Sequence, residues 1–531
     1  MVARGAKAFF GKRTPKREEV PMTNEGGPVT RRRFLQVAGL TGGAVFTSQP
    51  LDRFLGLGEA RAQVAGESGF PLAPEAAERI LREARGRGAE FADLYLERRA
   101  RTSVRLAGGV IESVEQGLWS GCGVRAVDGE RTGYAYADSF DEGVLAAAAR
   151  DAAAIASSSA PEAATIRWRR EHPPRFVRHQ RSFEDVPQDE RVRWILAAEK
   201  AARGADPAIS EVTIEHLDEM LRFLVINSDG LWIEDVSPLF MLRINAVAER
   251  GGRRANGLER LSYRLGAERL GDDAPVKAGR EAARKALAML EAGEAPSGEM
   301  PVVIAAGGGV LFHEAVGHGL EGDGVRLGIS FYTGRIGERV ASEKVTIFDT
   351  GALADLRGSF NIDDEGQVPQ PNLLIEKGVL RGFLNDRITS LVLKASRTGS
   401  GRRESYRYPP MVRMSNTYLQ PGEDDPAEII RQTGSGLYAR ALGGGEVDTT
   451  TGNFTFGVLE GYLIEGGRVT APVRGANLVG NGPEIMKRID LVGADQEFWP
   501  GTCGKGQWVP VSAGAPTLRI SSMTVGGSAG S

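Results

Sequence analysis

The chain has 531 residues, 41% hydrophobic and 25% charged, a composition typical of a soluble globular protein of about two to four domains. The formal net charge of −3 argues against nucleic acid or an anionic membrane surface as the main partner. The 70 glycines favour strand-rich structure with tight turns, and only two cysteines, Cys122 and Cys503, exclude a disulfide scaffold.

Residues 1–62 have the features of a twin-arginine-type export leader. Thr30–Gln36 contains the paired arginines followed by Phe-Leu, and the weakly apolar stretch Val37–Phe46 is too short to span a bilayer comfortably. Ala60–Ala62 offers a small-x-small cleavage site. We therefore expect a periplasmic or cell-envelope protein without an integral membrane span. If the leader is not functional, the protein is cytoplasmic.

Residues 63–295 are expected to form an N-terminal α+β domain. Alternating strand patterns extend from Ala92 to Ala137, and Ile209–Ala248 reads as three or four strands with a turn at Asn227–Gly230. His172, His179 and His216 have no spaced metal-ligating partners, so we assign the first two to the surface and the third to a sheet. Apolar residues at helical spacing predict four helices, over 74–87, 141–157, 191–203 and 274–290.

Residues 296–531 are expected to form a β-rich C-terminal domain that carries the catalytic chemistry. The segment Glu291–Gly298 is rich in Gly and Pro and marks the boundary. A buried strand, Met300–Ala306, leads into a glycine turn and then a helix. Beyond Val345, turns recur between short strands, which predicts a mostly antiparallel, barrel-like body.

The segment Gly307–Asp323 holds two of the chain's five histidines, His313 and His318, with Glu314 beside the first. Neutral imidazoles suit a zinc ion, and a nearby carboxylate can act as general base on a zinc-bound water. The usual zinc-peptidase spacing is i and i+4, about 40° apart around a helix, whereas i and i+5 are about 140° apart. We therefore predict that the helix is broken at Gly317, so that His318 can turn back to the ion.

A catalytic zinc needs a third protein ligand, for which Glu321, Asp323 and Cys503 are the candidates. Cys503 lies in a glycine-rich segment beside Lys505, which we interpret as a flexible loop holding a thiolate. Asp363–Glu365 could support the histidines from behind, and Arg402–Arg403 could anchor a substrate carboxylate. Within these segments we single out Asp364 and Arg403, along with Asp323, as candidates to hydrogen-bond the metal ligands or to bind substrate.

The motif His313–Asp323 resembles the signature of the TldD/PmbA (TldE) metallopeptidase family, in its catalytic TldD-type subunit. The resemblance extends over most of the second domain, through the segments Asn361–Gly366, Gly401–Tyr406, Met414–Tyr418, Gly475–Gly482, Cys503–Lys505, Pro516–Ile520 and Thr524–Gly527.

The resemblance implies a zinc peptidase acting on unfolded or extended peptides. His313, His318 and Cys503 would hold the metal, and Glu314 would be catalytic. It also implies a homodimer, or a heterodimer with a TldE/PmbA-like subunit. Two alternatives are a non-catalytic peptide-binding subunit with a structural metal, and an amidase acting on peptides of the cell envelope.

Overall fold

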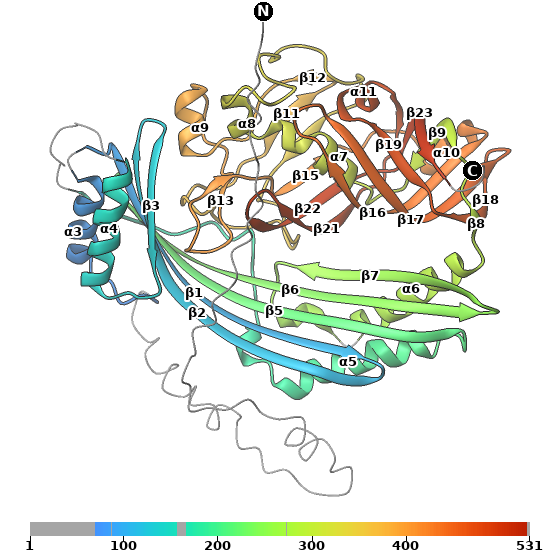
Figure 1. The fold of residues 1–531 in the computed structure, drawn as a ribbon, viewed down its shortest axis with the longest axis horizontal. Helices are drawn as coiled ribbons and strands as arrows, with labels where there is room; N and C mark the ends of the chain where they lie inside the picture. The colour runs from blue at the N-terminus through green and yellow to red at the C-terminus, as the bar shows by residue number, and fades with distance from the viewer. Residues whose placement is uncertain (1–68, 87, 157–165, 272, 528–531) are drawn as a thin grey trace, which may run out of the picture. The chain divides into compact units, whose positions relative to one another are not determined.

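The computed structural model describes residues 69–86, 88–156, 166–271 and 273–527 (Figure 1). The expected export leader lies outside these residues. The fold is α+β, as predicted, with 44% strand and 23% helix. In the described part of the chain, no helix is both long and apolar enough to cross a lipid bilayer.

The first half of the described chain is built on a seven-stranded, mostly antiparallel sheet in the order β3-β2-β1-β5-β6-β4, with β7 also paired to β6. Its strands are β1 (Phe91–Ala107), β2 (Val110–Asp128), β3 (Arg131–Ala137), β4 (Arg169–Glu171), β5 (Ile209–Asn227), β6 (Leu231–Arg250) and β7 (Arg253–Tyr263). The prediction of three or four strands within 209–248 was wrong. The region forms only β5 and β6, which pair along almost their whole length around the predicted turn at Asn227–Gly230.

Four α-helices cover this sheet: α3 (Pro74–Arg85), α4 (Glu142–Ala156), α5 (Gln188–Arg203) and α6 (Asp273–Leu290). Helices α3 and α4 pack together, and α4 contacts β2 and β3; α5 and α6 contact β5, β6 and β7 (Figure 1). Short 3₁₀ turns, η2 (Phe183–Asp185) and η3 (Ala267–Leu270), precede α5 and α6. All four predicted helices are confirmed, because each buries one apolar face against the sheet or a neighbouring helix.

A fully buried guanidinium joins this sheet to the second half of the chain. Arg125 on β2 forms ion pairs with Asp93 on β1 and with Glu365, the latter at 2.8 Å. Both carboxylates are also buried. Removing Arg125 would therefore leave two buried negative charges without their cation, a larger cost than losing a surface ion pair.

We expect Arg125→Met to lower the free energy of unfolding by about 3–5 kcal/mol, the usual cost of breaking a buried ion pair from one side. Urea unfolding followed by circular dichroism would measure it. The matched control is Arg105→Met on β1, where exposed ion pairs with Glu112 and Glu215 predict a loss of less than about 1 kcal/mol. Equal losses in the two variants would contradict this account.

The second half contains the predicted barrel. Strands β16 (Gly436–Val447), β9 (Gly298–Ile304), β23 (Leu518–Gly526), β19 (Asn477–Asn481) and β17 (Asn453–Glu465) pair in this order, and β17 pairs again with β16 to close a five-stranded barrel. Three short strands extend the same sheet: β8 (Gly293–Glu294), β18 (Arg468–Arg474) and β20 (Ile489–Val492).

A six-stranded sheet lies beside the barrel, in the order β12-β11-β10-β15-β22-β21. Its strands are β10 (Ile347–Asp349), β11 (Asn372–Glu376), β12 (Val379–Leu380), β15 (Asn416–Leu419), β21 (Glu497–Gly504) and β22 (Trp508–Ala515). Strands β13 (Gly401–Arg402) and β14 (Met411–Val412) form a separate pair. Within the described residues, the remaining helical segments are α7 (Val310–Ala315), η4 (Gly317–Leu320), α8 (Gly322–Arg326), α9 (Arg387–Val392), α10 (Pro426–Thr433) and α11 (Gly482–Lys487).

The short helix α7 is the element that both bodies share. It contacts β16 and β17 of the barrel and also β15 and β22 of the six-stranded sheet. Its residues Val310, Leu311, Phe312 and Ala315 are buried within one continuous hydrophobic core. Any side chain carried by α7 is therefore held in place from two sides.

Candidate metal centre

The position of α7 depends on glycine at its start. Gly307 has a φ of 85°, which turns the chain out of β9. A Cβ atom on Gly309 would lie only 2.5 Å from backbone atoms of Ala513 and Gly514 on β22. This close approach seats α7 against β22 and directs His313 into the core, where it is 1% exposed.

The predicted helix break is confirmed. Helix α7 ends at Ala315, and the cap residue Val316 leaves helical geometry at φ −127° and ψ −49°. The chain then tightens into the 3₁₀ turn η4, which carries His318. A side chain on Gly317 would overlap the sulfur of Met414, because its Cβ would lie 2.2 Å from that atom. The break brings the two imidazole rings to a centroid separation of 5.5 Å.

Cys503 completes the cluster, although it lies 185 residues beyond His318 in the sequence. Its Sγ lies 3.3 Å from Nε2 of His318, and one donor atom from each of His313, His318 and Cys503 lies within 4.8 Å of the others. The expectation of a flexible loop was wrong, because Cys503 is on β21, paired with Val509 of β22. The buried Arg413 fixes this hairpin by donating to the carbonyls of Cys503 and Gln507 at 2.8 and 2.7 Å.

The three side chains fit a zinc ion. Thiolate and imidazole are zinc's usual ligands, and bond lengths of about 2.3 and 2.0–2.1 Å place such donors about 3.5 Å apart on a tetrahedral ion. Both ring nitrogens of His313 are buried without a hydrogen-bond partner, a costly arrangement that a bound cation would relieve. Burial raises the pKa of Cys503, but the nearby charges of His313 and His318 and the hydrogen bond with His318 outweigh it and lower that pKa to about 4.

A buried carboxylate stands behind His318. Oε2 of Glu321 accepts a hydrogen bond from Nδ1 of His318 at 2.8 Å, which leaves Nε2 facing Cys503. Burial raises the pKa of Glu321, but the charges of Lys505 and His318 lower it by more. The net effect is a pKa well below the usual value, so the carboxylate stays ionised. Carboxylates of this kind orient metal-binding histidines and increase their basicity.

The cation Lys505 serves this carboxylate and not the thiolate. Its Nζ donates to Glu321 at 3.0 Å and to Asp323 at 2.8 Å. Of the three candidates for a third metal ligand, Cys503 alone belongs to the three-residue cluster, while Glu321 and Asp323 lie behind it.

Glu321→Gln is expected to weaken zinc binding about 10- to 100-fold, the usual effect of losing a carboxylate behind a ligating histidine. The glutamine keeps the shape but loses the charge that holds His318 in its tautomer. Competition with a chromophoric chelator would measure the affinity. Asp323→Asn is the matched control, because it removes a negative charge that pairs with Lys505 but has no contact with His318. Equal losses of zinc affinity in the two variants would contradict the role assigned to Glu321.

Glu314 differs from its neighbours in being open to solvent. Its side chain is 23% exposed, while His313 before it and Ala315 after it are buried. Its Oε2 lies 3.6 Å from Nε2 of His318, the nitrogen that faces Cys503. The carboxylate thus lies beside the cluster on a side that water can reach.

Asp364 and Arg403 bind each other. Oδ2 of Asp364 accepts from the backbone N–H of Arg403 at 2.7 Å, and the Arg403 guanidinium lies 4.2 Å from the centroid of the Tyr95 ring on β1. The neighbouring Asp363 accepts backbone N–H groups, including that of Gly401 at 2.9 Å. These contacts fix loops against the seven-stranded sheet and give no support to the histidines.

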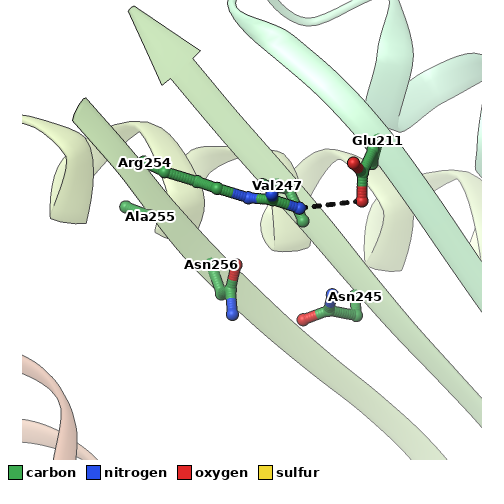
Figure 2. Close-up of a pocket in the computed structure, with 6 residues that line it drawn as sticks. All are labelled: Glu211, Asn245, Val247, Arg254, Ala255 and Asn256. Atoms are coloured by element: carbon green, nitrogen blue, oxygen red, sulfur yellow. Dashed lines mark hydrogen bonds and ion pairs between the residues drawn. The ribbon is translucent and has the colours of Figure 1, made fainter. Parts of the chain in front are cut away.

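A separate shallow pocket of about 450 Å³ lies over strands β5, β6 and β7 (Figure 2). An ion pair between Arg254 and Glu211, at 2.9 Å, crosses it. Its lining residues are Glu211, Asn245, Val247, Arg254, Ala255 and Asn256. They include no histidine or cysteine, so this pocket has none of the chemistry of the cluster.

A β-barrel and a second sheet that together hold a His-His-Cys cluster beside an accessible glutamate define a metallopeptidase-type centre. Three family models match the chain: PmbA/TldA metallopeptidase domain 1 over residues 92–156, the central domain over 181–290 and the C-terminal domain over 297–527. Together they span more than half of the sequence. The chain belongs to the PmbA/TldD metallopeptidase family.

Curated relatives agree with this membership. A metalloprotease TldD homolog from Haemophilus influenzae is 39% identical over 455 residues, covering 83% of this chain and 94% of the relative. A zinc metalloprotease TldD homolog from Saccharolobus solfataricus is 30% identical, covering 64% of this chain and 76% of the relative.

Solved structures share the fold. TldE from Thermococcus kodakarensis has a TM-score of 0.68 at 19% identity, covering 85% of this chain and 99% of that one. A protein from Thermotoga maritima described as a putative modulator of a DNA gyrase has a TM-score of 0.70 at 21% identity, with the same coverage.

Proposed function

We propose that the protein is a zinc-dependent peptidase that hydrolyses peptide bonds in unfolded or extended peptides. The observation that carries this proposal is the convergence of His313, His318 and Cys503 beside the accessible Glu314. The name of the S. solfataricus relative, a zinc metalloprotease, supports zinc as the metal.

Each residue has a distinct role in this proposal. His313, His318 and Cys503 hold the metal, and Glu321 orients His318. Zinc in such a site polarises a carbonyl and lowers the pKa of water. Glu314 accepts a proton from the attacking water and passes it to the departing amine, the ordinary work of a general base placed within reach of its substrate.

The number of candidate ligands favours catalysis over a structural metal. Structural zinc sites normally use four protein ligands, whereas catalytic sites use three and leave one position open. Among the described residues the cluster has three members, and Asp323, the fourth ligand that the structural alternative would use, is bound to Lys505.

Removing the metal is expected to abolish peptidase activity, and zinc should restore it. The purified protein would be treated with a chelator, dialysed and assayed on an unfolded protein such as reduced casein, before and after adding one equivalent of zinc. Calcium added in its place is the control, because a thiolate and two imidazoles select zinc over a hard cation. Full activity after complete metal removal would contradict the proposal.

We further propose that the protein is exported through its twin-arginine leader and works as a homodimer or with a TldE-like subunit. The motif at residues 30–36 supports export, and the structural likeness to TldE supports pairing with a TldE-like subunit. Fusing residues 1–62 to a reporter that is active only after export would test the first statement, and light scattering would test the second. The leader also favours the alternative of an amidase that acts on peptides of the cell envelope. Faster cleavage of cell-wall peptides than of casein would support that alternative.

A further inference from the structure

Arg413 is a fully buried cation that reaches two separate parts of the metal centre. On one side, its guanidinium donates to the carbonyls of Cys503 and Gln507, near the turn between β21 and β22. On the other side, its Nε lies 3.8 Å from Oε1 of Glu321, the carboxylate that orients His318. A single guanidinium therefore lies between the Cys503 segment and the group that supports an imidazole.

The groups that compensate the buried charge of Arg413 belong to the metal centre. Burying a cation is costly unless hydrogen bonds or an opposite charge offset the loss of water. Two carbonyls take the hydrogen bonds of its terminal nitrogens. Nε of Arg413 and Oε1 of Glu321 have no hydrogen-bond partner among the described residues, so each is offset by the opposite charge 3.8 Å away. The location of this guanidinium is thus tied to Cys503 and to Glu321.

The fork shape of the guanidinium fixes the direction of its contacts with the hairpin. Nη1 donates to Gln507 at 2.7 Å and Nη2 donates to Cys503 at 2.8 Å, so one planar group spans both carbonyls. A lysine would keep the positive charge, but its single ammonium on a flexible stem does not reproduce two donors in a fixed plane. The backbone position of Cys503 therefore depends on the fork and not on the charge alone.

The chain on either side of Arg413 is attached to the same centre. The carbonyl of Val412 accepts from Nζ of Lys505 at 2.9 Å. The sulfur of Met414 packs against Gly317, where the helix that carries the first histidine has ended. The guanidinium is therefore carried by a segment that is itself held in place, as a group that orients metal ligands requires.

We propose that Arg413 is a positioning residue of the metal centre, which holds the Cys503 thiol at the distance from His318 that a shared zinc ion requires. Arg413 itself touches neither the metal nor the substrate and acts through the backbone of Cys503. This role rests on the proposed function, because it needs Cys503 to be a metal ligand.

Arg413→Lys in the full chain is expected to weaken zinc binding about 10- to 100-fold, the usual effect of losing a group that supports a metal ligand. In a Cys503→Ser background the same change should weaken zinc binding less than about threefold, because no thiolate is left to position. Competition with a chelating dye would give the zinc affinity of the full chain, the two single variants and the double variant.

Cobalt bound in place of zinc gives a second measurement, because its thiolate charge-transfer band depends on the contact between cobalt and sulfur. Arg413→Lys should weaken or shift this band at saturating cobalt. If Arg413→Lys does not fold, Arg413→Gln, which retains one amide donor group, takes both measurements in its place.

Arg191→Lys is the matched control. Arg191 is also buried, donates to the carbonyls of Phe183 and Val186, and forms an ion pair with Asp218. None of these partners belongs to the metal cluster. Urea unfolding should show a loss of stability in both lysine variants, whereas the zinc affinity and the cobalt band of Arg191→Lys should stay unchanged.

Two results would overturn the role of Arg413 and leave the proposed function intact, provided that Cys503→Ser alone weakens zinc binding. They are an unchanged zinc affinity in Arg413→Lys, and a loss of the same size with and without the Cys503 thiol. An unchanged zinc affinity in Cys503→Ser would instead overturn the ligand assignment, and the role of Arg413 with it.

Discussion

Glu314→Gln is expected to lower kcat about 10²- to 10⁴-fold while zinc stays bound, because a general base contributes a factor of this size. Glutamine has the shape of glutamate but cannot take a proton from water. Glu314 is not a member of the three-residue cluster, so the metal should be retained at one equivalent per chain. Peptidase kinetics and metal analysis on the same preparation would measure both quantities.

The matched control for this substitution is Glu338→Gln, at an exposed glutamate whose ion pair with Arg335 lies on the surface. It should leave both kcat and zinc content unchanged. Unchanged cleavage in Glu314→Gln would exclude the base role. Loss of zinc together with activity would instead make Glu314 a metal ligand.

Cys503→Ser is expected to weaken zinc binding about a hundredfold and to remove activity at limiting zinc. Zinc sites with four ligands have binding free energies of about 10–16 kcal/mol, or about 3 kcal/mol for each ligand. Serine keeps nearly the same volume on β21 but offers a hydroxyl in place of a thiolate. Competition with a chelating dye would give the affinity.

The chain's other cysteine provides the control for this change. Cys122 is also fully buried on a strand, but it packs among Leu94, Leu96 and Val124 in the core of the seven-stranded sheet. Cys122→Ser should lower stability modestly and leave zinc affinity unaltered. If the two serine variants bound zinc equally well, Cys503 would not be a ligand.

Local features of this structure could be predicted from the sequence. The extra residue between His313 and His318, together with Gly317, required a broken helix, and the break is where the glycine indicated. Alternating patterns predicted β1 and β2, although Phe91–Glu97 of β1 and Gly121–Val127 of β2 are buried on both faces. The number of strands in 209–248 was overestimated because β5 and β6 are far longer than the usual strand of about five or six residues.

The surroundings of the metal cluster could not be derived in the same way. Arg413 and Glu321 act through contacts with residues 90 and three positions away, and neither shows a periodic pattern. The glycines around Cys503 suggested a loop, but in the structure they make room for aromatic rings on a strand. A Cβ on Gly501 would overlap the ring of Trp499, and a Cβ on Gly504 would overlap the ring of Trp508. Asp364 satisfies a backbone N–H that only the folded loop brings to it.

The hairpin that carries Cys503 is held by distant parts of the chain. Strand β21 is the last strand of its sheet and pairs with β22 alone. Yet its carbonyls at Gly501 and Cys503 accept hydrogen bonds from the buried guanidiniums of Arg357 and Arg413, at 2.7 and 2.8 Å. Residues 501 and 503 are paired with Val511 and Val509 of β22, so these two arginines bind carbonyls inside the hairpin and add to its pairing.

Those two arginines couple the position of the Cys503 thiol to segments of the chain 144 and 90 residues away from their carbonyl partners. The metal cluster can therefore assemble only after both segments have folded against β21.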